Sequence, residues 1–126
     1  SPDGKWIAYD SNSPGHFEVF VNNFPKAGAS PILVSKAGGR NPRWGPDGRE
    51  LFYWNEAELI ALRLDFSGGP RVVARTTLFH ASYAGADHAN FDVHPDGNRF
   101  VVLTGQARPQ RLILALNPFA PAAPGR

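Results

Sequence analysis

Residues 41–54 read Asn-Pro-Arg-Trp-Gly-Pro-Asp-Gly-Arg-Glu-Leu-Phe-Tyr-Trp, and the Pro-Asp-Gly at the centre of this segment occurs three times in the chain. The other copies are Ser-Pro-Asp-Gly-Lys at residues 1–5 and His-Pro-Asp-Gly-Asn at residues 94–98, so the intervals are 44 and 49 residues. A short run of residues common in β-strands follows each copy. A fixed period of a few tens of residues is typical of repeat folds, and this one matches a β-propeller blade.

Each Pro-Asp-Gly predicts a tight turn between two antiparallel strands. Proline presets φ for the second position of a type I turn, Asp tolerates the third position and accepts a nearby backbone N–H, and Gly adopts the left-handed conformation that closes a hairpin. We therefore interpret Asp3, Asp47 and Asp96 as turn residues and not as catalytic carboxylates. His94 is expected to be the first residue of its turn.

The segments around the turns predict ten strands. In Glu56–Leu64 good helix formers predominate, but the matching segments of the other repeats alternate apolar and polar residues as strands do, so a strand is predicted there too. The expected strands, in chain order, are residues 6–9, 17–21, 31–35, 41–44, 51–54, 60–66, 71–79, 90–93, 100–103 and 112–116.

These strands predict an all-β fold, a propeller fragment of about two and a half to three four-stranded antiparallel blades. The blades cover approximately residues 1–40, 41–89 and 90–117, and the Pro- and Ala-rich residues 118–126 are expected to form a disordered tail. Such an arc has an unpaired strand edge at each end. We expect an N-terminally truncated fragment, whose ring is closed by missing blades of the same protein or by self-association.

Composition restricts the class of protein. The 126 residues include 13 Gly and 12 Pro, but 42% are hydrophobic, which excludes collagen and general disorder. No apolar run approaches the roughly 20 residues that span a bilayer, so membrane insertion is not expected. The net charge of +2 comes from interspersed charges, which does not favour nucleic-acid binding. Without Cys there are no disulfides, and without a visible signal peptide the compartment stays open between bacterial periplasm and cytoplasm.

Three segments carry a resemblance to a known family: residues 1–9, 41–53 and 92–100 resemble the blades of TolB-like β-propellers, a group similar in architecture to WD-repeat propellers. More narrowly, residues 38–44 and the ending at residues 112–117 resemble the last blades of propellers attached to bacterial serine/threonine kinase or regulator domains. The resemblance implies a binding platform for a protein or peptide. It implies no catalytic residue and no cofactor.

Other chemistry has weak support in the sequence. No Gly-x-Ser-x-Gly nucleophile elbow occurs, so catalysis is not expected within these residues. His88, Asp92 and His94 lie close in sequence, but Asp92 and His94 correspond to Arg43 and Gly45 one repeat earlier, so no metal site is predicted. The aromatic side chains at repeated positions are expected to pack between blades, and a stacking groove is the alternative. They are Trp6, Tyr9, Trp44, Phe52, Tyr53, Trp54 and Phe100.

The candidate binding rim lies opposite the Pro-Asp-Gly turns, on loops formed by residues 38–41, 79–89 and 104–110. The side chains best suited to a hot spot there are Arg40, Tyr83, Asp87, His88 and Arg108. The leading hypothesis is a non-enzymatic protein- or peptide-binding module at the C-terminal end of a larger bacterial signalling or envelope protein. The alternative is the accessory propeller of a prolyl-oligopeptidase-like serine peptidase whose catalytic domain lies outside this chain.

Overall fold

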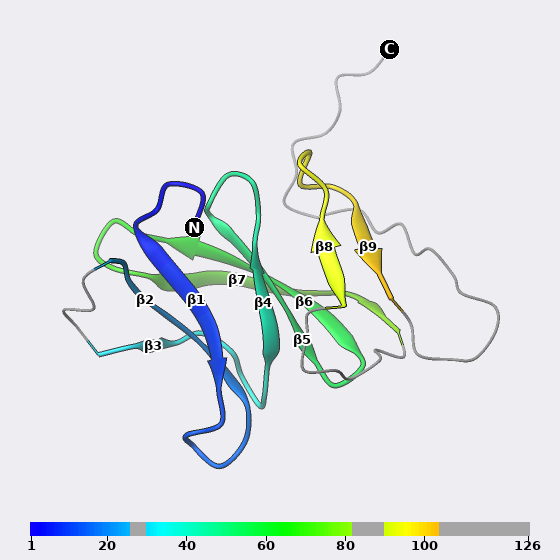
Figure 1. The fold of residues 1–126 in the computed structure, drawn as a ribbon, viewed down its shortest axis with the longest axis horizontal. Helices are drawn as coiled ribbons and strands as arrows, with labels where there is room; N and C mark the ends of the chain where they lie inside the picture. The colour runs from blue at the N-terminus through cyan, green and yellow to red at the C-terminus, as the bar shows by residue number, and fades with distance from the viewer. Residues whose placement is uncertain (26–29, 82–89, 104–126) are drawn as a thin grey trace.

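The structure, a computed structural model, describes residues 1–25, 30–81 and 90–103 (Figure 1). These residues form β-strands and no helix, and no described segment is a helix able to cross a membrane. The strands are β1 (Trp6–Ser11), β2 (Glu18–Asn23), β3 (Ile32–Leu33), β4 (Arg40–Trp44), β5 (Glu50–Asn55), β6 (Glu58–Asp65), β7 (Arg71–His80), β8 (Phe91–Val93) and β9 (Phe100–Val102).

The strands form three antiparallel sheets in which chain order equals spatial order. The first sheet is β1-β2-β3, the middle sheet is β4-β5-β6-β7 and the third sheet is β8-β9. The predicted all-β, antiparallel architecture is confirmed, with nine of the ten expected strands at the expected places. The tenth strand, at residues 112–116, and the tail at residues 118–126 lie outside the described residues.

The segment rich in helix formers is a strand, as predicted. Glu56 and Ala57 form the turn between β5 and β6, with Glu56 at φ 51°, and β6 then pairs with β5 on one side and β7 on the other. Four successive residues of β6, residues 59–62, are buried. Burial in the centre of a sheet therefore outweighs the weak helix propensity of this segment.

The three Pro-Asp-Gly turns share one geometry, with the glycine at φ 69°, 69° and 72°. In each turn the Gly amide donates to the carbonyl three residues earlier, and the Asp carboxylate accepts the amide two residues later. The bond donated by the Gly amide measures 2.9 Å for Gly4 to Ser1, 3.1 Å for Gly48 to Gly45 and 2.8 Å for Gly97 to His94. The bond accepted by the Asp carboxylate measures 3.1 Å for Lys5 to Asp3, 2.8 Å for Arg49 to Asp47 and 2.9 Å for Asn98 to Asp96. The prediction that these Asp residues serve the turns is confirmed.

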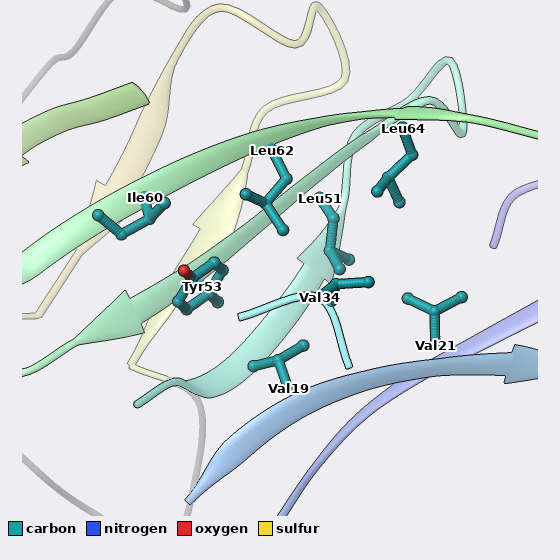
Figure 2. Packing of buried hydrophobic residues seen from close by; sticks show 8 residues of the cluster. All are labelled: Val19, Val21, Val34, Leu51, Tyr53, Ile60, Leu62 and Leu64. Atoms are coloured by element: carbon teal, nitrogen blue, oxygen red, sulfur yellow. The ribbon is translucent and has the colours of Figure 1, made fainter. Parts of the chain in front are cut away.

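The middle sheet is buried on both faces. Because successive side chains of a strand point to opposite faces, Leu51 and Tyr53 of β5 pack toward the first sheet while Phe52 and Trp54 pack toward the third. Figure 2 shows the first of these two cores, in which Val19 and Val21 of β2 face β5 and β6. Each fully buried side chain of this size stabilises the fold by roughly 1.5–3 kcal/mol.

The predicted packing of aromatic side chains between sheets is confirmed for some of the residues named from the sequence. Phe52 contacts Phe100 of the third sheet edge to face, with ring centroids 4.8 Å apart, and Trp54 contacts Phe91 in the same way at 6.1 Å. Tyr9 departs from the prediction, because its ring stacks on Phe20 within the first sheet at 5.9 Å, on the face that no described sheet covers. The difference follows from position: Tyr9 lies on the outermost face of the stack.

Candidate functional site

The strands end on two rims. The turn rim has the three Pro-Asp-Gly turns, which lie together at the top of Figure 1. The loop rim, at the opposite ends of the strands, consists of the β1–β2 hairpin, the β3–β4 connection, the turn at Glu56 and Ala57, and the end of β7 at His80. The predicted Gly38–Asn41 corner belongs to this loop rim, because β4 starts there and ends at the turn rim.

Arg40 is the one predicted rim residue within the described part of the chain. It lies at the first position of β4, half-buried, with its guanidinium carbon 4.0 Å from the centroid of the Phe17 ring. Its Nε atom is buried and has no hydrogen-bond partner among the described residues. The predicted residues Tyr83, Asp87, His88 and Arg108 lie outside the described residues.

Two backbone features fix the corner beside Arg40. The amide of Gly39 donates to the carbonyl of Phe17 at 2.9 Å, and the amide of Asn41 donates to the Asp10 carboxylate at 2.7 Å. A Cβ on Gly39 would lie 2.8 Å from the Tyr53 ring, so only glycine lets the connection approach that closely. The corner is therefore hydrogen-bonded to β1 and to the residue before β2, and it lies close against Tyr53 of β5.

A buried carboxylate lies next to this corner and was not predicted from the sequence. Glu18 is 6% exposed. The Ser35 hydroxyl donates to its Oε2, and its Oε1 is 2.8 Å from His16 Nε2 and accepts the Gly38 amide at 3.2 Å. Burial alone would raise the pKa of Glu18, but the hydrogen bonds from Ser35, His16 and Gly38 together hold this pKa below its ordinary value.

The order of these groups determines their chemistry. In a Ser-His-acid triad the imidazole lies between the hydroxyl and the carboxylate and removes the hydroxyl proton. Here the Glu18 carboxylate lies between His16 and Ser35, and the Ser35 hydroxyl also accepts the Val19 amide at 2.8 Å. The cluster thus connects β2 to the β3–β4 connection and does not form a nucleophilic site.

A cavity of about 390 Å³ opens on the same rim, between the β3–β4 connection and the ends of β5, β6 and β7. Glu58 lies 3.5 Å from His80 across its wall, and the amide of Ala81 donates to the carbonyl of Ala57 at 2.8 Å. Polar side chains predominate in the lining, so the cavity suits a polar ligand group. The lining residues are Ala37, Asn55, Glu56, Ala57, Glu58 and His80.

The turn rim has a larger and more apolar hollow of about 440 Å³ between β1 and β4, which Trp6 and Trp44 line. Both tryptophans pack on Phe66, with ring centroids 5.0 Å and 6.3 Å away. This is the place where the alternative of a stacking groove retains support, because the two rings are only partly buried. Arg43 adds one cation to the wall.

Two residues of the weak metal candidate, Asp92 and His94, make local backbone hydrogen bonds, and the third, His88, lies outside the described residues. The His94 amide donates to the Arg99 carbonyl at 2.8 Å, so His94 is the first residue of its turn, as predicted. Asp92 accepts the amide of Val93 at 2.9 Å. Among residues 1–25, 30–81 and 90–103, no group of three or more His, Asp or Glu side chains is arranged to hold a metal ion.

Comparison with protein-family models and with curated protein sequences finds no match to this chain.

Proposed function

We propose that this chain is part of a β-propeller that serves as a non-enzymatic protein- or peptide-binding module in a larger bacterial signalling or envelope protein. The stack of sheets supports the propeller, because adjacent sheets pack face to face and their equivalent turns lie on one rim (Figure 1). Rigid sheets with ligand-contacting loops at one end are a common arrangement for recognition.

The observation that carries the binding role is the convergence of the first and middle sheets on the loop rim. The cavity there is lined by the middle sheet and by Ala37 of the connection that arrives from the first sheet, and Arg40 lies on the same rim with its guanidinium over Phe17. A half-buried Arg on an aromatic ring, next to a polar hollow, has the composition of an interface hot spot. The carboxylates of Glu56 and Glu58 would recognise donors of a bound peptide.

Selection from a displayed library of random peptides tests this proposal. The selected peptides are then made synthetically. Their affinity for the protein is expected to fall about tenfold or more when Glu56→Lys reverses the charge of this exposed residue of the loop rim. The matched control is Lys5→Glu, a charge reversal on the turn rim, which should leave affinity unchanged. A library with no selected binder, or binders sensitive to Lys5→Glu and not to Glu56→Lys, would contradict the proposal.

A further inference from the structure

The two ends of the stack each present an apolar face that no other described sheet covers. On the first sheet, register places Ile7, Tyr9, Phe20 and Leu33 on one face, because Tyr9 lies opposite Phe20 and Phe20 opposite Leu33. We call these four residues the leading face; Ile7 is 41% exposed and Leu33 53%. On the third sheet, Val101 and Leu103 point away from the stack, 52% and 60% exposed, and form the trailing face.

The repeat indicates what covers such faces. Ile7 and Tyr9 precede Leu51 and Tyr53 by the 44 residues that separate the first two turns, and Leu51 and Tyr53 are both 0% exposed against the first sheet. The leading face thus occupies the positions that, in the middle sheet, pack on a preceding sheet.

The same comparison applies to the trailing face. Val101 and Leu103 follow Phe52 and Trp54 by the 49 residues that separate the last two turns, and in the middle sheet those two aromatic side chains are buried against the third sheet. The trailing face therefore occupies the positions that pack on a following sheet. One chain therefore carries, at its two ends, both surfaces of a sheet-on-sheet contact. The chain already forms this contact twice, between its first and middle sheets and between its middle and third sheets.

We infer that the leading face of one chain binds the trailing face of a second copy, so that copies stack head to tail with the same sheet-on-sheet contact found within the chain. Such a contact is heterologous: each copy uses two different surfaces, and the assembly grows in one direction until it closes or is capped. Exposed apolar side chains grouped on one face are typical of an interaction surface. This inference goes beyond peptide binding and does not depend on the loop rim.

Light scattering after size exclusion, from about 1 to about 200 µM protein, tests the assembly over the range in which micromolar contacts dissociate. The wild-type mass should rise with concentration. Ile7→Glu and Val101→Glu should each raise the apparent dissociation constant about tenfold or more, because the contact would bury an unpaired charge. Val73→Glu is the matched control: Val73 is 51% exposed on β7 and lies on neither face.

An equimolar mixture of the two face variants distinguishes head-to-tail stacking from a symmetric dimer. Ile7→Glu retains its trailing face and Val101→Glu its leading face, so the mixture should form dimers at a concentration at which each variant alone is monomeric. Circular dichroism checks that both are folded, and Ile7→Ser with Val101→Ser replaces them if either is not. A monomeric wild type at the highest concentration, a mixture that stays monomeric, or a single variant that associates as strongly as the wild type would overturn the inference.

Discussion

The first and middle sheets are formed by successive copies of the same sequence repeat, yet they are stabilised differently. The middle sheet is covered on both faces, and every position of β5 from Glu50 to Trp54 is buried. The first sheet is covered on one face only, and β1 has no residue that is fully buried. What the first sheet has instead is a buried polar cluster around Glu18, at the position that Glu58 occupies in the middle sheet. Equivalent positions of the repeat thus contribute differently to the stability of the fold, because different segments pack against them.

The largest expected effect tests this difference in burial directly. Leu51→Ala should lower the free energy of unfolding by about 2–5 kcal/mol, because it leaves a cavity in a closed core. The equivalent Ile7→Ala, at a side chain 41% exposed, should cost about 1 kcal/mol or less at low protein concentration. Urea unfolding followed by tryptophan fluorescence measures both. Equal costs would mean that the leading face is already covered in the monomer.

A smaller effect is expected from the polar cluster of the first sheet. Ser35→Ala should cost about 1–3 kcal/mol, because it removes the hydroxyl that donates to the buried Glu18 carboxylate and accepts the Val19 amide. The matched control is Ser67→Ala, which also removes a serine-carboxylate bond, at 3.0 Å to Asp65, but on an exposed loop. That control should change stability much less.

The same variant has a pH signature. The pKa of Glu18 is lowered in the folded protein, so its contribution to stability is present above the unfolded-state pKa of about 4.3 and is lost as pH falls through the folded value. Ser35→Ala removes one cause of the lowered pKa, so the difference between wild type and variant should shrink as pH falls below about 4. A difference that is constant from neutral pH to pH of about 3 would assign the cost to the Val19 amide alone.

The strands and turns could be predicted from the sequence because local rules determine them. Pro-Asp-Gly favours a tight turn through its own residues. For Glu56–Leu64, comparison with the matching segments of the other repeats predicts a strand in spite of the helix propensity of this segment. The spacing of the repeats also identified which residues are equivalent. The exposure of equivalent residues could not be predicted in this way, because it depends on which sheet lies beside them.

The candidate site was less predictable. The Gly38–Asn41 corner was identified from its place opposite the turns, and Arg40 lies there. The cluster beside it was missed, although His16 and Glu18 are two residues apart, which is a signal for one face of a strand. Ser35 joins them only through the pairing of β2 with β3, and no periodicity in the sequence relates residues 17 positions apart.

The smallest expected effects concern the turns, where the sheets should differ least. Gly4, Gly48 and Gly97 all have φ near 70°, so replacing each by Ala should cost about 1–2 kcal/mol for the left-handed backbone. A Cβ on Gly4 would meet nothing within 4 Å, whereas one on Gly97 would lie 3.2 Å from Pro46 of the preceding turn. Gly97→Ala should therefore cost more than Gly4→Ala in thermal unfolding. If Gly4→Ala proved as costly as Gly97→Ala, the contact between adjacent turns would add no cost, and the turns would act independently of the stacking of sheets.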